Sequence, residues 1–431
     1  MNRRDFLVRT GALAGGMLAA ACGTNIGGGG GASGGGTSGG GGGKVTLTHW
    51  YHQYGEQGTQ QAVERYAQEY TKQNPKVQIN VVWVPGDYGT KLSAALVGPN
   101  PPDVYETSPT LQMVKQNQAV RLDDLFSDAD KRDFYPNVMQ TNTINGHIYG
   151  VKMVTDVGLL YYRKSLLQRA GVQPPQSAAD VVAAARTLTQ GHTKGMFVGN
   201  DGGIGALEVL LPQSNRVSFL SGGDTVGFAT QQTAEALQPL IQLNANGSLL
   251  VGNTTDWFQP DAINQNLVAM QWTGLWAMKE VRAAIGDDFD VLPWPAFSSG
   301  GTPVTFIGGW SAIVNGHSNH VAEAKKYVKW LWIDNKDIQK DFNLSYGFHI
   351  PPRKSIAAKA TPLHSGPAKK AVDILGKYGL ALPPTWDATM GTAYGDAVSA
   401  IVKDRHDATS SLPLLKGAQQ KAQQELDQEL K

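Results

Sequence analysis

The composition of the chain changes abruptly at Lys44, and this boundary determines which residues can build a fold. Residues 23–43 are almost all glycine. They lack the apolar side chains that a core needs, so we interpret them as a flexible linker with a reach of roughly 25 Å. They do not resemble a phosphate-binding loop, because no Gly-Lys-Ser/Thr ends them. From Lys44 onward apolar side chains recur with the periods of strands and helices, and folded structure is expected to begin there.

Strand and helix patterns alternate after this boundary. Residues 45–50, 77–84 and 104–107 read as strands, and the segments 57–73 and 88–97 between them read as helices. This order predicts an open, mostly parallel α/β sheet. Ligands bind such sheets at the carboxyl ends of the strands, so the loops that follow these three strands are the first candidates for a site.

The rest of the chain continues the mixed pattern without an internal repeat. Strands are predicted at 158–162, 289–292 and 308–314, and helices at 178–188, 321–333 and 417–430. The fold class predicted for the chain is therefore α/β.

The first 22 residues are interpreted as a targeting segment. Arg3 and Arg4 followed by Asp-Phe-Leu resemble a twin-arginine export signal, and the small residues before Cys22 resemble a bacterial lipoprotein cleavage site. Cys22 would then carry the lipid anchor and hold the exported protein on the outer face of the cytoplasmic membrane. The alternative is a simple signal peptide with Cys22 incidental.

Composition excludes several classes of function. A formal net charge of +1 gives no basis for nucleic-acid binding. The single cysteine excludes internal disulfides and thiolate zinc clusters. No GxSxG nucleophile elbow is present, because GxSxG occurs only within the glycine-rich linker, and no HExxH motif is present. The two close histidine pairs, His49/His52 and His317/His320, are interpreted as surface or turn residues. We therefore expect no enzyme, no cofactor and no metal, although a secreted carbohydrate-acting enzyme with a carboxylate pair stays open.

Several segments together resemble the extracellular solute-binding proteins of ABC importers, in particular the sugar-binding group that includes maltose-binding protein. They are 45–50 (VTLTHW), 73–79 (QNPKVQI), 100–104 (NPPDV), 145–151 (NGHIYGV), 160–164 (LYYRK), 170–172 (AGV), 269–276 (AMQWTGLW), 307–310 (IGGW) and 347–353 (GFHIPPR). The resemblance implies a two-lobed periplasmic-binding-protein-like fold, with crossing strands as a hinge. Lobe one would hold 44–155 and about 307–360, and lobe two 156–306 and about 361–431.

The resemblance further implies that a cleft between the lobes captures a sugar by hinge closure and that a membrane permease receives it from a monomeric binding protein. A sugar site needs aromatic plates and planar hydrogen-bonding side chains. The candidate ligand-binding residues are Trp50, Tyr51, Gln53, Tyr54 and Glu56 after the first strand, Asp87 and Tyr88 after the second, Glu106 and Thr107 after the third, Thr155 and Asp156 at the first crossing, Trp272, Gly274 and Trp276 on the far wall, Gly309 and Trp310 at the second crossing, and Arg353 and Trp386.

Some alternatives remain open at this stage. Arg353 could instead form a structural salt bridge. The same fold could bind a polyamine, a peptide or a metal, and the adjacent tyrosines Tyr161 and Tyr162 resemble those of ferric-ion binders. Alternation within an apolar strand would send one of these two rings inward and the other outward, which favours a structural role.

Overall fold

The computed structural model describes residues 44–431, so the predictions for the leader, Cys22 and the linker 23–43 lie outside the described residues. The first sheet has the strand order β2-β1-β3-β14-β6. Its strands are β1 (Val45–His52), β2 (Val77–Val84), β3 (Val104–Thr107), β6 (Val151–Lys152) and β14 (Ser311–Val314). β1 pairs in parallel with both β2 and β3. The carboxyl ends of these three strands therefore meet at one edge, as predicted.

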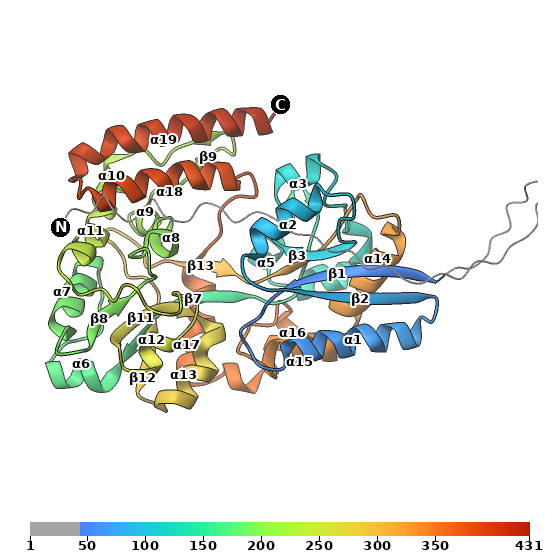
Figure 1. The fold of residues 1–431 in the computed structure, drawn as a ribbon, viewed down its shortest axis with the longest axis horizontal. Coiled ribbons are helices and arrows are strands. Elements are labelled where there is room, and N and C mark those ends of the chain that lie inside the picture. The colour runs from blue at the N-terminus through green and yellow to red at the C-terminus, as the bar shows by residue number, and fades with distance from the viewer. Residues whose placement is uncertain (1–43) are drawn as a thin grey trace, which may run out of the picture. The chain divides into compact units, whose positions relative to one another are not determined.

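Helices cover both faces of the first sheet, with α1 and α2 on opposite sides of β1 and β2 (Figure 1). α1 buries Val63, Tyr66 and Tyr70 on one stripe, as its amphipathic pattern predicts. The elements of this part are α1 (Thr59–Gln73), α2 (Tyr88–Leu96), α3 (Leu111–Lys115), η1 (Asp123–Leu125), α4 (Asp128–Asp133), α5 (Pro136–Gln140), β4 (Thr143–Ile144), β5 (His147–Ile148), α14 (Val321–Lys329), η3 (Trp330–Asp334), α15 (Lys336–Leu344) and α16 (Lys354–Ala357).

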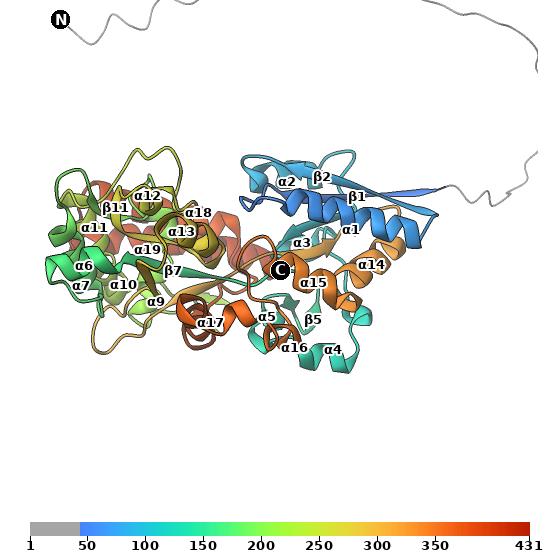
Figure 2. The ribbon, with the colours of Figure 1, turned by 90° about the horizontal axis from the view of Figure 1, so that it is seen from below.

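The second sheet is built around β7, which lies between helices in both ribbon views (Figure 1 and Figure 2). The sheet has the order β15-β13-β7-β11-β8, and β12 also pairs with β7. Its strands are β7 (Asp156–Arg163), β8 (Lys194–Phe197), β11 (Val268–Gly274), β12 (Phe289–Leu292), β13 (Thr305–Gly308) and β15 (Gly379–Leu380). β7 is antiparallel to β11, β12 and β13. Both sheets are thus mixed, which corrects the expectation of mostly parallel sheets.

Two hydrophobic cores flank the second sheet, and α18 and α19 pack side by side over one of them (Figure 1). α19 begins at Ala408, earlier than the predicted 417. The elements are α6 (Lys164–Ala170), α7 (Ala178–Leu188), α8 (Ile204–Leu207), α9 (Leu210–Ser214), β9 (Leu220–Ser221), β10 (Thr225–Val226), α10 (Gln231–Ala236), α11 (Gln238–Ala245), α12 (Asp261–Asn264), η2 (Leu275–Ala277), α13 (Met278–Ile285), η4 (Thr361–Leu363), α17 (Gly366–Tyr378), α18 (Ala388–Lys403) and α19 (Ala408–Glu429).

The chain passes directly from strand to strand between the sheets at two neighbouring points, one between β6 and β7 and the other between β13 and β14, and it passes a third time on the way from β14 to β15. The strand predicted at 308–314 is therefore interrupted at Gly309. Gly309 has a φ of +88°, and a Cβ there would lie 2.1 Å from the carbonyl oxygen of Val154, so only glycine fits this crossing. The division into lobes stays a proposal, with its second boundary best placed at Gly309, because β13 pairs with β7.

Across residues 44–431, none of the helices combines the length and the apolar character that crossing a bilayer requires.

Candidate functional site

Aromatic side chains gather at the edge of the first sheet where β1 ends. The imidazole of His52 stacks on the indole of Trp310, with ring centroids 4.1 Å apart and an interplanar angle of 27°. The ring centroids of Tyr54 and His52 lie 3.8 Å apart, and Tyr88 meets Trp310 edge-on with ring centroids 5.7 Å apart. His52 and Trp310 are both partly exposed. This edge therefore offers a solute both an aromatic surface and a polar ring atom.

A buried carboxylate organises this aromatic edge. Glu106 is fully buried and accepts hydrogen bonds from the main-chain N–H of His52 at 2.5 Å and from the Tyr54 hydroxyl at 2.8 Å. Its Oε1 also lies 2.5 Å from Nδ1 of His52. Burial, and then the charge of Glu106, raises the pKa of Tyr54 and of Tyr88 well above the usual range. Both phenols therefore keep their protons and act as hydrogen-bond donors.

A second aromatic wall lies at the end of β11, where Gly274 pairs with Gly158 near the first crossing. Trp276 lies 6.1 Å from Trp257 and is stacked with Phe306 at 6.3 Å. The indole N–H of Trp276 donates to the carbonyl of Phe258 at 2.8 Å, which fixes the ring orientation. A Cβ on Gly274 would lie 1.9 Å from the Trp276 ring, so the glycine at the end of β11 lets that ring lie against the strand.

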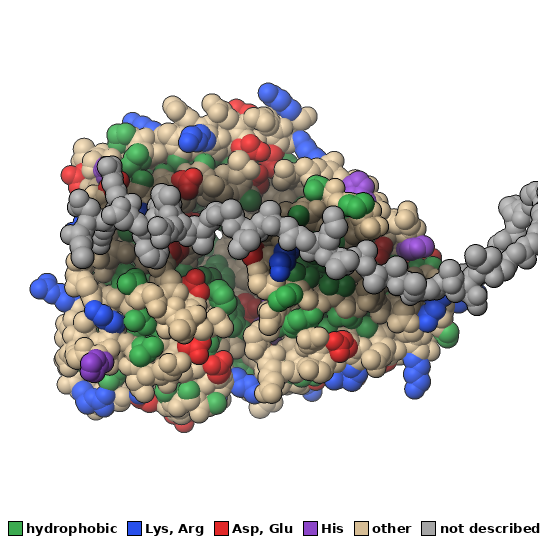
Figure 3. All heavy atoms as spheres, viewed as in Figure 1, with side chains coloured by type: hydrophobic (Ala, Val, Ile, Leu, Met, Phe, Trp, Pro, Cys, Tyr) green, Lys and Arg blue, Asp and Glu red, His purple; other side chains and the backbone are tan. Residues whose placement is uncertain are grey.

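A cavity of about 350 Å³ brings residues of both sheets together. Ser108, Pro109 and Thr110 line it from the loop after β3, while Phe306 lines it from β13 and Trp386 from the loop before α18. A cavity lined by both polar and apolar side chains suits a small organic solute. In the space-filling view, hydrophobic side chains lie inside the depression near the middle of the face shown (Figure 3).

The structure pairs two of the predicted ligand carboxylates with a protein cation. His349 is buried, and its ring nitrogens lie 3.1 Å from Glu56 and 2.7 Å from Asp156. Burial alone would lower the pKa of His349, but the charges and hydrogen bonds of Asp156 and Glu56 outweigh it and raise the pKa to about 10. The imidazolium therefore bridges both carboxylates beside the first crossing and offsets one of their two negative charges.

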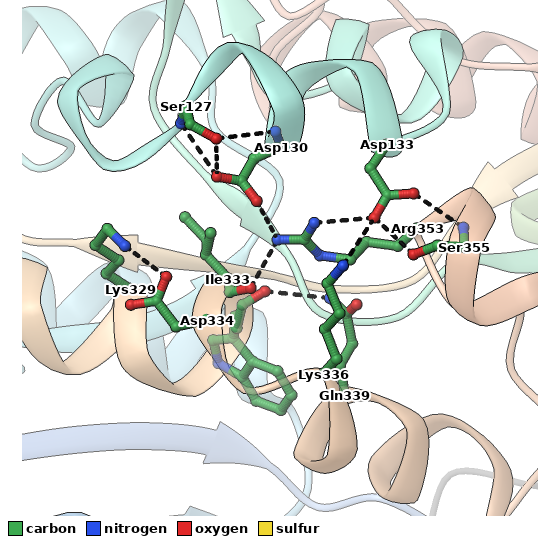
Figure 4. Close-up of polar contacts among 11 residues, drawn as sticks. Ser127, Asp130, Asp133, Lys329, Ile333, Asp334, Lys336, Gln339, Arg353 and Ser355 are labelled. Atoms are coloured by element: carbon green, nitrogen blue, oxygen red, sulfur yellow. Dashed lines mark hydrogen bonds and ion pairs between the residues drawn. The ribbon is translucent and has the colours of Figure 1, made fainter.

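The structure buries three further residues that were predicted to contact the ligand, and as ligand contacts they stay predictions. Tyr51 is fully buried in the core between the first sheet and α1, since alternation in β1 points it away from His52. Trp272 is fully buried in the middle of β11, with Trp294 edge-on at 6.0 Å. Arg353 is 1% exposed and forms ion pairs with Asp130 and Asp133 at 2.9 and 3.1 Å (Figure 4). The salt-bridge alternative for Arg353 is therefore the one observed.

The remaining predicted residues occupy several environments and stay predictions as ligand contacts. Asp87 caps the start of α2 by accepting from the Thr90 N–H at 3.2 Å. Thr155 is buried, and its main chain pairs with Ile350 at the first crossing. Trp50 and Thr107 are half-buried, Gln53 is exposed, Gly274 and Gly309 shape the backbone, and Tyr54, Tyr88, Glu106, Trp276, Trp310 and Trp386 lie at the edges and cavity described above.

Sequence reasoning missed four side chains of these walls. His52 was interpreted with His49 as a surface or turn residue, yet His49 is fully buried beneath the sheet and only His52 reaches the edge. Trp257, Phe258 and Phe306 could have been found by the sequence feature that pointed to Trp50, namely an aromatic residue beside a predicted turn. The tyrosine pair 161–162 is buried within β7. Between residues 44 and 431 no group of three His, Cys, Asp or Glu side chains could hold a metal ion.

Known structures share this fold. A solute-binding protein of an ABC transporter from Thermotoga lettingae, bound with α-D-tagatose, aligns with a TM-score of 0.74 at 18% identity, covering 89% of this chain and 100% of that one. CpMnBP1 with mannotriose bound aligns with a TM-score of 0.72 at 24% identity, covering 88% of this chain and 100% of that one. The GacH receptor of Streptomyces glaucescens aligns with a TM-score of 0.73 at 21% identity, covering 88% of this chain and 99% of that one. The predicted periplasmic-binding-protein-like fold is confirmed.

Sequence comparison leads to the same group. A probable ABC transporter-binding protein of Deinococcus radiodurans is 27% identical over 224 residues, which are 47% of this chain and 51% of that protein. The match thus spans about half the length of this curated relative. The model of the family "bacterial extracellular solute-binding protein" matches residues 54–331. The chain therefore belongs to the bacterial extracellular solute-binding protein family, whose members bind solutes rather than convert them.

Proposed function

We propose that this chain is the substrate-binding lipoprotein of an ABC importer and that it captures a sugar or oligosaccharide in the cleft between two lobes. The observation that carries the proposal is the pair of aromatic walls, His52–Trp310 on the first sheet and Trp257–Trp276–Phe306 on the second. Aromatic rings pack against the C–H faces of sugars, while the polar groups between them bind hydroxyls. The bound tagatose and mannotriose of the structural neighbours support the same class of solute.

The occupation of the carboxylates at the site by protein hydrogen bonds favours a sugar over a polyamine. A polyamine would need unpaired carboxylates facing the aromatic walls. Glu106 is instead occupied by His52 and Tyr54, and Glu56 and Asp156 are occupied by His349. A sugar carries no charge and therefore needs no free carboxylate at the site.

Capture would proceed by hinge closure about the crossings that join β6 to β7 and β13 to β14. Each crossing is short, and Gly309 occupies a left-handed conformation there, so a few dihedral changes could bring the walls together. The closed form would then deliver the solute to the membrane permease. In this proposal Cys22 carries the lipid anchor and residues 23–43 tether the protein to the outer face of the cytoplasmic membrane.

A thermal-shift screen of the purified protein tests the proposed solute class. Mono-, di- and oligosaccharides are compared with polyamines, amino acids and ferric ion. A ligand at one hundred times its Kd adds about 2.7 kcal/mol to the free energy of unfolding. We expect at least one carbohydrate, and none of the controls, to raise the melting temperature. A shift caused only by a control would overturn the carbohydrate assignment.

A further inference from the structure

One ring nitrogen of His52 is held by the protein and the other is free. Nδ1 lies 2.5 Å from Oε1 of Glu106, and the side chain is 18% exposed. Within residues 44–431, Nε2 of His52 has no hydrogen-bond partner, and it is not enclosed as Nε2 of His49 is. Because His52 is the last residue of β1, this free nitrogen lies at the cleft edge of the first sheet.

The contacts of Glu106 determine which nitrogen carries the proton. Its Oε1 also accepts the main-chain N–H of His52, and its Oε2 accepts the hydroxyl of Tyr54. A carboxylate surrounded by donors acts as an acceptor, so the hydrogen shared with His52 belongs to Nδ1. A neutral imidazole has one N–H and one lone pair. In the neutral ring the lone pair therefore lies on Nε2, which makes this nitrogen a hydrogen-bond acceptor at the cleft.

The ring is also fixed in place by packing. It stacks on Trp310 at 4.1 Å and meets Tyr88 edge-on at 6.0 Å. An acceptor held on two sides keeps its direction before the solute arrives, which lowers the ordering cost of binding. Such an acceptor discriminates strongly, because a solute without the matching hydroxyl leaves it desolvated and unpaired.

We infer that His52 is a specificity-determining contact whose Nε2 accepts a hydrogen bond from one hydroxyl of the bound solute, and that Glu106 is the positioning residue that sets its tautomer and orientation. The inference rests on the proposed function, because it requires a hydroxyl-bearing solute in this cleft.

The test uses the purified protein and the carbohydrate that raises its melting temperature most, together with the monodeoxy analogues of that carbohydrate. His52→Asn keeps an amide near Nδ1 that can still bond Glu106 but has no atom at the Nε2 position. Calorimetry should show about tenfold weaker binding of the parent sugar, equivalent to about 1.4 kcal/mol. The wild type should discriminate against one monodeoxy analogue, and His52→Asn should not. His147→Asn, on β5, is the matched control.

The outcomes separate this inference from the proposed function. If no carbohydrate binds the wild type, both fall. If the wild type binds and His52→Asn keeps the same affinity and the same discrimination, only the inference falls. If the asparagine variant does not fold, His52→Gln, which places an amide near Nε2, replaces it. This variant should retain the discrimination, and loss of the discrimination here would overturn the inference.

Glu106 needs a readout that a purely structural role would not change. Glu106→Gln should weaken binding and also reduce the preference for Nδ1–H in ¹⁵N spectra of the His52 ring. An unchanged ring spectrum would overturn the positioning role of Glu106.

Discussion

Removing the guanidinium of Arg353 should destabilise the protein and leave solute binding intact. Arg353 forms ion pairs with Asp130 and Asp133 and donates to the carbonyl of Ile333 at 2.7 Å. Its guanidinium also lies 4.6 Å from the centre of the Phe134 ring. Loss of one partner from a buried ion pair costs about 3–5 kcal/mol. At about 2 °C per kcal/mol for a protein of this size, Arg353→Ala should lower the melting temperature by roughly 6–10 °C.

Differential scanning calorimetry measures this loss, and a surface pair provides the control. Lys336 pairs with the same Asp133 at 3.7 Å, but its side chain is 56% exposed. Lys336→Ala should therefore change the free energy of unfolding by less than about 0.5 kcal/mol. An Arg353→Ala variant with wild-type stability and lost sugar affinity would refute the structural role and restore the ligand contact.

The same ion pairs give a pH signature. Burial would raise the pKa values of Asp130 and Asp133, but hydrogen bonds from Ser127 and Ser355 and the pairing with Arg353 outweigh it and lower them. An aspartate whose pKa is lower in the folded state stabilises the fold at pH values above its unfolded-state pKa of about 3.9. This contribution is lost as the pH falls through the folded-state pKa. The stability difference between wild type and Arg353→Ala should shrink below about pH 4.

Three further predictions concern the hinge. The folded-state pKa of His349 is raised from 6.5 to about 10. Its contribution to stability is therefore complete below pH 6.5 and is lost as the pH rises towards 10. Denaturant titrations should show this decline in the wild type and a flatter pH profile in His349→Asn. Gly309→Ala should destabilise the protein by at least about 1 kcal/mol because of its φ of +88° and the contact with Val154; an unchanged denaturation midpoint would contradict this. Saturating sugar should reduce the radius of gyration in X-ray scattering, and identical radii would argue against hinge closure.

The local elements of the first sheet could be predicted from the sequence, because their determinants are local. β2 and β3 have the predicted bounds, since alternation and the flanking turns mark both ends. The strand β1 continues two residues beyond the predicted end, to His52. That small error had a large effect, because alternation over the full strand sends Tyr51 to the core and His52 to the cleft edge.

Other features depend on contacts that the order of residues does not reveal. Arg353 is partnered by carboxylates more than two hundred positions earlier in the chain. The interruption between β13 and β14 follows from the close approach of Gly309 to Val154, which only the folded crossing creates. The aromatic wall at Trp257 and Trp276 likewise requires two loops to meet at the end of β11.

The central proposal is tested most directly by isothermal titration of the purified protein with the carbohydrate that raises its melting temperature most. The titration is repeated with variants that truncate one aromatic wall at a time. Trp310→Ala and Trp276→Ala should each weaken binding about tenfold or more, because each removes an aromatic surface at the site. Trp330→Ala, beside Tyr70 at the far end of α1, should not change the affinity. Wild-type affinity in both wall variants, or a wild type that binds no carbohydrate, would contradict sugar capture between these walls.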